Sequence, residues 1–265
     1  MLAAVLAAGI LFTVLAAGCS PRGDEKAFHQ AEDALGRGEY LEAAALYRSF
    51  ITNYPDSPLA PEGQYKISYI YSRHVRDLKK AMDAYSMLFY LYPESPQAVT
   101  AREDRAELFS SRKEYRKAIA DYAWLLENGP PEKNDLYRYN IAMEYIKMND
   151  FRQARIELEE LLKNIPSTPL APQVYYQIAT THYLEGNLEE AVKGYDTVIS
   201  KFPDNPICIE ARLGKATALE EAGSLTEALA LLEELKDEYS NTDVVKIRIK
   251  STRERLKKEP RLRKR

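Results

Sequence analysis

Apolar and small residues recur along the chain with helical spacing, and the pattern itself repeats. An alanine returns at intervals of 36 to 38 residues, at Ala43, Ala81, Ala118, Ala154, Ala191 and Ala228. Each alanine has an apolar residue four positions after it: Tyr47, Tyr85, Tyr122, Leu158, Tyr195 and Leu232. Because positions four apart share one face of a helix, the pattern predicts a series of helices that each bury one face.

A second periodic set predicts a partner helix in every unit. The residue twelve positions before each alanine is small or aromatic: Ala31, Tyr69, Ala106, Ala142, Ala179 and Ala216. Turn residues such as Gly38-Glu39 and Gly186-Asn187 lie between the two segments. Small side chains allow two helices to approach closely. The repeated unit is therefore expected to be a pair of helices joined by a tight turn.

A proline-containing phrase separates one pair from the next. Tyr54-Pro55-Asp56-Ser57-Pro58 has copies around Pro93, Pro166 and Pro203. The first proline ends a helix, and the second is expected at the first position of the next helix. The Ser, Thr or Asn between them can cap that helix with its side-chain oxygen. Asn128-Gly129-Pro130-Pro131 departs from the phrase, which predicts a slight discontinuity between the third and fourth pairs.

These signals define an all-α protein. The expected helices are 24–36, 40–53, 58–73, 78–91, 96–111, 115–127, 134–148, 151–164, 169–185, 188–201, 206–222 and 225–238, with a last amphipathic helix over 243–258. Their length and order resemble the tetratricopeptide repeat (TPR). The resemblance implies a right-handed superhelical solenoid of six TPR-like helix pairs over 24–241, with a capping helix and basic tail over 242–265.

The Tyr-Pro-Asp-Ser-Pro phrase narrows the resemblance. It is similar to the repeats of outer-membrane lipoproteins of the BamD/YfiO group and of the TPR domain of Tol-associated coordinator proteins. Those groups imply a periplasmic protein that binds other envelope proteins. This chain has six regular pairs, so the likeness to the assembly lipoprotein concerns its general plan.

The N-terminus predicts export. Residues 1–18 contain no charge and end in Leu15-Ala16-Ala17-Gly18-Cys19. A short apolar core followed by small residues is typical of a cleaved signal peptide. The string resembles the lipobox of bacterial lipoproteins, which implies acyl chains such as palmitate on Cys19, a tether over 19–26, and an outer-membrane location on the periplasmic face. An uncleaved membrane anchor is the alternative, since eighteen apolar residues approach the length of a spanning helix.

The charge distribution is uneven along the chain. The net charge is −3, but the residues from Lys246 onward contain 11 Lys or Arg against two Glu. A solvated, disordered end is the simplest interpretation of this basic tail, and anionic headgroups or an acidic partner are the alternatives. Export argues against a nucleic-acid partner.

No constellation of residues indicates catalysis or a cofactor. His29, His74 and His182 do not stand at metal-binding spacings from one another or from a cysteine. Phosphate-binding loops and nucleophile motifs are absent from the sequence. Cys208 lies between two isoleucines, which is typical of a buried thiol. The sequence therefore predicts a non-catalytic protein without a metal, a cofactor or a small-molecule substrate.

The TPR resemblance also implies a binding surface, because the first helix of each pair lines the groove of such solenoids. Mapping this register gives Tyr139, Asn140, Met143, Tyr176, Gln177 and Tyr183 as the main partner-binding residues, with Lys66, Ile70, Thr180 and Thr217 beside them. Tyrosine and methionine are enriched in interface cores. Ordinary surface aromatic residues are the alternative interpretation.

The functional hypotheses follow from the fold and the anchor. The first is a lipid-anchored scaffold that captures protein segments, with the β-barrel assembly machinery of the outer membrane as its expected partner. The second is a coordinator of peptidoglycan synthesis or Tol-Pal-type envelope constriction. The third is a glycan-binding accessory lipoprotein in export or motility.

Overall fold

The structure, a computed structural model, describes residues 23–262 and the side chains as far as Lys258. The predicted signal peptide, Cys19 and the tether residues before Gly23 lie outside the described residues. All regular elements within 23–262 are helical, which confirms the all-α prediction. The described residues divide into two compact units, 23–98 and 99–262.

In the first unit each helix packs against the next helix along the chain. Its elements are α1 (Gly23–Gly36), α2 (Tyr40–Asn53), α3 (Ala60–Tyr69), the π-helix η1 (Ile70–Val75) and α4 (Leu78–Leu91). The helix expected over 58–73 starts two residues later, because Pro58 and Leu59 form a turn. Its last turns widen into η1, which the sequence pattern did not predict.

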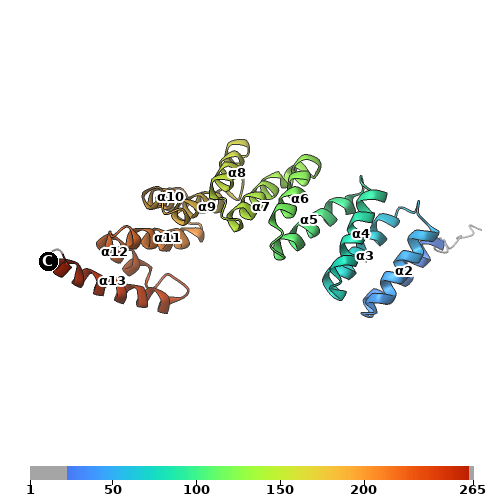
Figure 1. Cartoon of the computed structure of the whole chain (residues 1–265), viewed down its shortest axis with the longest axis horizontal. Coiled ribbons are helices and arrows are strands. Elements are labelled where there is room, and N and C mark those ends of the chain that lie inside the picture. The colour runs from blue at the N-terminus through green and yellow to red at the C-terminus, as the bar shows by residue number, and fades with distance from the viewer. Residues whose placement is uncertain (1–22, 263–265) are drawn as a thin grey trace, which may run out of the picture. The chain divides into compact units, whose positions relative to one another are not determined.

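The second unit repeats the same arrangement from α5 onward (Figure 1). Its elements are α5 (Pro96–Ser111), which begins at the division, α6 (Tyr115–Asn128), the 3-10 helix η2 (Pro131–Lys133), α7 (Asn134–Lys147), α8 (Phe151–Asn164), α9 (Ala171–Leu184), α10 (Leu188–Lys201), α11 (Ile207–Glu221), α12 (Leu225–Leu235) and α13 (Thr242–Leu262). η2 lies where a discontinuity was expected, but the division into units falls earlier in the chain.

The periodic residues form the core, as the pattern predicts. All six repeat alanines, from Ala43 to Ala228, are fully buried, and the six residues four positions after them are at most 6% exposed. In the set twelve positions earlier, the alanines are also fully buried, whereas Tyr69 is half-buried. The helix pairs are therefore held by the contacts that the repeat specifies. Cys208 is buried, as predicted.

The turn inside each pair contains one residue in the left-handed region. Glycine occupies this place at φ angles near +80° in Gly38, Gly186 and Gly223. Arg76, Lys113 and Asn149 take the equivalent places with φ of 59°, 64° and 58°. Because an L side chain is disfavoured there, the arginine and the lysine are held by the surrounding helices at a cost.

The proline-containing joints carry side-chain hydrogen bonds that link successive pairs. Thr168 Oγ1 accepts a hydrogen bond from the Leu170 amide at 3.1 Å and donates one to Asp135 Oδ2 at 2.7 Å. Ser57 makes the same two kinds of bond with the Leu59 amide and with Asp24. The capping prediction is confirmed at α5, where Ser95 Oγ accepts a hydrogen bond from the Ala98 amide at 3.2 Å. It is wrong at α3 and α9, because Ser57 and Thr168 bond to the residue before the helix and not to a helical amide. The second proline stands at the first helical position only in α5, at Pro96.

None of the helices in residues 23–262 combines the length and the apolar character that crossing a membrane requires.

Candidate partner-binding groove

Successive first helices of the second unit bring several predicted residues together. Tyr176, Thr180 and Tyr183 lie on α9, Thr217 on α11 and Arg248 on α13, and they line a hollow of about 250 Å³ with Glu210. We call this set the tyrosine hollow. Its walls come from α9 and α11, which are first helices of their pairs and were expected to line a TPR groove, and from α13.

The packing of the second helix positions the tyrosines. The Tyr176 ring lies 5.8 Å from the buried Tyr195 ring, measured between centroids and tilted by 50°. The Tyr195 hydroxyl is 3.2 Å from Thr180 Oγ1. A side chain on Gly214 would reach within 2.6 Å of the Tyr195 ring, so glycine is required for this close approach. Tyr195, expected only as a packing residue, therefore also borders the hollow.

A hydrogen bond closes one side of the hollow. Tyr183 donates its hydroxyl proton to Glu221 Oε1 at 2.5 Å, joining α9 to α11. This bond is the main cause of a raised pKa for Tyr183. Burial raises the pKa of Tyr176, and it raises the pKa of Tyr195 to about 12. The three phenols are therefore neutral near pH 7, so their hydroxyls can both donate and accept hydrogen bonds.

The other predicted residues lie on α7 and the facing side of α9. Tyr139 packs against the core cluster of Ala142, Leu158, Leu161 and Val174. Burial raises the pKa of Tyr139, and the neighbouring Gln177 side chain opposes this shift. Asn140 and Met143 are half-buried on α7 and do not line the hollow. The structure thus groups Tyr176 with Tyr183, and Tyr139 with Gln177.

Ile70 and Lys66, which the groove register also selects, lie in the first unit. Ile70 is fully buried at the start of η1, so its expected place on an exposed groove is wrong. The π-helix shifts the register by about one residue from that point, which explains the error. Lys66 is half-buried in the first unit, beside Glu32 and Glu62.

The sequence mapping missed the charged residues of the hollow. Glu210 stands in the first turn of α11, and Arg248 lies on α13, which was expected only to cap the array. Arg248 forms an ion pair with Glu220, to which Thr252 also donates a hydrogen bond. The repeat spacing gave no signal for Arg248, because the residue 37 positions earlier is Ala211, which is fully buried in the core. The charged residues that line the hollow are thus Glu210 and Arg248, and Glu220 neutralises the charge of Arg248.

A larger hollow of about 610 Å³ lies in the first unit between α2 and α4, over α3. Ile51, Ile67 and Met87 are among its lining residues, and Met87 is half-exposed. It lies over the second helices of two pairs, away from the first-helix face that the sequence singled out.

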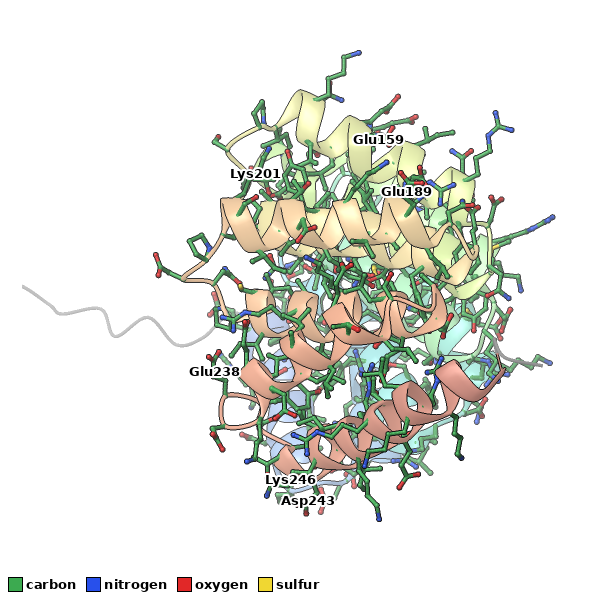
Figure 2. The ribbon with its side chains drawn as sticks, turned by 90° about the vertical axis from the view of Figure 1, so that its left-hand side faces the viewer. Glu159, Glu189, Lys201, Glu238, Asp243 and Lys246 are labelled. Atoms are coloured by element: carbon green, nitrogen blue, oxygen red, sulfur yellow. The ribbon has the colours of Figure 1, made fainter. Side chains whose placement is uncertain are left out.

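The described residues offer little for catalysis. Within 23–262 no group of three or more His, Cys, Asp or Glu side chains could hold a metal ion. The paired glutamates of the second helices, such as Glu159 and Glu189, are exposed, and Figure 2 labels both of them. TPR folds are typically scaffolds without enzymatic activity.

Known proteins share the repeat and the fold. A 99-residue stretch is 32% identical to a NADPH oxidase activator of Dictyostelium discoideum, and the match spans 32% of this chain and 16% of that protein. The structure of a tetratricopeptide repeat protein from Parabacteroides merdae is similar at 21% identity, with a TM-score of 0.59 over 87% of this chain and 86% of that one.

Two further structures are similar at 16% identity. PilW, a widely conserved type IV pilus biogenesis factor, has a TM-score of 0.52 over 85% of this chain and 99% of its own. YrrB, a TPR protein with an unusual peptide-binding site, has a TM-score of 0.53 over 77% of this chain and 97% of its own. The tetratricopeptide-repeat family profile matches residues 28–96, 139–206 and 195–241, well over half of the sequence, so this chain belongs to the tetratricopeptide-repeat family.

Proposed function

We propose that this chain is a lipid-anchored scaffold on the periplasmic face of the outer membrane that binds segments of other envelope proteins. The observation that supports the binding role most directly is the tyrosine hollow, in which side chains of α9, α11 and α13 converge on one exposed depression. The anchor rests on the Leu-Ala-Ala-Gly-Cys string that ends at Cys19.

The chemistry of the hollow suits a peptide segment. Neutral hydroxyls of Tyr176, Tyr183 and Thr217 can pair with backbone groups of a bound chain, and the tyrosine rings supply apolar contact area. Glu210 adds a carboxylate that favours a segment with Lys or Arg near this point. Tyr139 and Gln177 extend the same type of surface toward α7.

The envelope role that we favour is outer-membrane protein assembly. It follows from the resemblance of the Tyr-Pro-Asp-Ser-Pro joints to the BamD/YfiO group. Coordination of peptidoglycan synthesis or of Tol-Pal-type constriction is the alternative with the same scaffold. The likeness to PilW is one of fold, and it makes a role in export or motility a further candidate to test.

A pull-down from detergent-solubilised envelopes tests the proposal. We expect the protein to retain a β-barrel assembly subunit, and Tyr183→Ala to reduce its recovery about tenfold, as loss of a central tyrosine anchor commonly does. Tyr90→Ala is the matched control, because Tyr90 is 81% exposed on α4, in the first unit. Recovery that Tyr183→Ala leaves unchanged would argue against the groove.

The identity of the retained partner separates the roles. A peptidoglycan synthase or a Tol component in place of the assembly subunit would support the coordinator role, and glycan strands without protein would support the accessory role. The anchor is tested independently with Cys19→Ala, which should release the protein from membranes or block its processing. Membrane attachment at the normal mature size would refute lipidation.

A further inference from the structure

The last helix carries a row of cations that the proposed groove does not use. Lys246, Lys250, Arg253 and Lys257 follow one another at spacings of four, three and four residues, so they lie along one face of α13. Lys236 of α12 stands on the opposite side. Together with Glu233, Ile249 and Glu254 these residues line a depression of about 430 Å³, which we call the basic groove.

Acidic neighbours leave a clear positive excess in the basic groove. Arg253 pairs with Glu233, and Lys246 Nζ lies 3.8 Å from Asp243 Oδ1. Figure 2 shows Asp243 and Lys246 side by side at the start of α13. Lys250 and Lys257 are exposed. From Thr242 to Lys258 the helix contains seven Lys or Arg against Asp243 and Glu254.

The repeat spacing shows what this face of α13 corresponds to. Ala142, Ala179 and Ala216 stand 37 residues apart, and the next step leads to Arg253. In the fifth pair, Ala179 faces the second helix of its own pair, because a Cβ atom on Gly194 would lie 2.7 Å from the Ala179 Cβ atom. Arg253 therefore marks the face on which the second helix of a seventh pair would pack.

A second helix like those of the six pairs cannot pack closely on this face of α13. The close crossing requires a small residue where α13 has Arg253, and Lys250 and Lys257 stand one turn to either side. A helix with carboxylates at the same spacing would instead complement the row, which extends about 16 Å along the axis at about 1.5 Å per residue. We propose that the basic groove docks an acidic amphipathic helix of a partner protein, in the place of a seventh second helix.

The charge arrangement favours such a helix over a flat anionic surface. Val245 and Ile249 are on the buried face of α13, so the opposite face contains Ile247, Glu254 and Lys258, with Asp243 beside them. A flat membrane surface would meet two carboxylates and one lysine on this face. The cations, in contrast, line the depression between α12 and α13, where a helix can lie against them.

Fluorescence anisotropy with a designed probe tests the proposal. The probe is a labelled helix-forming peptide of about 20 residues in which four glutamates at spacings of four, three and four flank a leucine stripe; about 20 residues give five helical turns. We expect the full chain to bind it at low salt, and Lys250→Glu/Lys257→Glu to weaken the affinity about tenfold or more. Lys79→Glu/Lys163→Glu is the matched control, because both lysines are exposed and lie on α4 and α8.

Further measurements distinguish an acidic helix from other molecules that could bind the basic groove. Equal affinity for the probe and for a peptide with the same glutamates scattered around the helix would overturn the proposal. So would binding that the Lys250→Glu/Lys257→Glu variant retains. Sedimentation with phosphatidylglycerol vesicles that this variant abolishes, without any binding of the peptide, would assign the face to a lipid surface instead. Self-association that the variant abolishes, again without peptide binding, would assign it to a second copy of the chain.

Discussion

At the scale of single residues, the close packing of neighbouring helices depends on glycines, which have no side chain. Gly194 lets α10 approach α9 at Ala179, and Gly214 gives the Tyr195 ring room against α11. The sequence indicated Ala179 through its periodicity, but Gly194 stands outside every recurrent set. A helix-interior glycine has no signature of its own, because its role is set by the atoms of another helix.

Gly194→Ala should therefore destabilise the protein. The new methyl group would meet the Ala179 Cβ atom at 2.7 Å, and overpacking costs about 1–3 kcal/mol, of which the better helix propensity of alanine offsets up to about 1 kcal/mol. We expect a net loss of about 1–2 kcal/mol in the free energy of unfolding, measured by urea denaturation.

Gly36→Ala provides the comparison. No atom lies within 4 Å of a Cβ built on Gly36, so this change should leave stability equal or slightly higher. If both alanine variants were equally stable, the close crossing of α9 and α10 would not be a constraint.

At the scale of helices and turns, most boundaries could be predicted from the sequence. Eleven of the thirteen observed α-helices begin within one residue of the expected position, because prolines and small turn residues mark their ends. The π-helix η1 and the left-handed Arg76 and Lys113 could not be predicted. Their conformation is imposed by the repeat length and contradicts the preference of the residues themselves.

Lys113→Gly should consequently stabilise the protein. The turn between α5 and α6 keeps φ at 64° whatever residue occupies it, and glycine removes the steric cost that a side chain adds there. We expect a gain of about 1 kcal/mol, measured as a shift in the thermal unfolding midpoint.

Ala120→Gly tests whether the stabilisation expected for Lys113→Gly comes from the left-handed backbone conformation at that position. Ala120 is exposed in the interior of α6, where glycine should instead cost about 1 kcal/mol. Effects of the same sign in Lys113→Gly and Ala120→Gly would contradict the strain assigned to Lys113.

At the scale of the whole molecule, the sequence predicted that basic residues gather from Lys246 onward in a chain of negative net charge. It did not predict on which face of α13 these cations lie. Their place on α13 depends on which face of that helix covers α12, and this follows only from packing. The same holds for Arg248, which joins the tyrosine hollow because α13 continues the series of first helices. The cap is thus part of two candidate surfaces.

α13 also completes the core at its end of the array. Val245 and Ile249 belong to one buried cluster with Ala216, Leu232 and Leu235. Ending the chain after Asn241 would expose these side chains, and large-to-small losses in such cores cost about 2–5 kcal/mol per residue. Because each repeat in a solenoid contacts only its neighbours, the damage should stay near the new end.

Hydrogen exchange detected by mass spectrometry can show this locality. We expect the truncated chain to lose amide protection in α11 and α12, while residues 23–98 keep theirs. The full-length Lys250→Glu/Lys257→Glu variant should keep protection throughout, because both side chains are exposed and the buried cluster is unchanged. Uniform loss across both units would mean that the array unfolds as one cooperative body, whereas retained protection in α11 and α12 would mean that α13 serves binding and not stability.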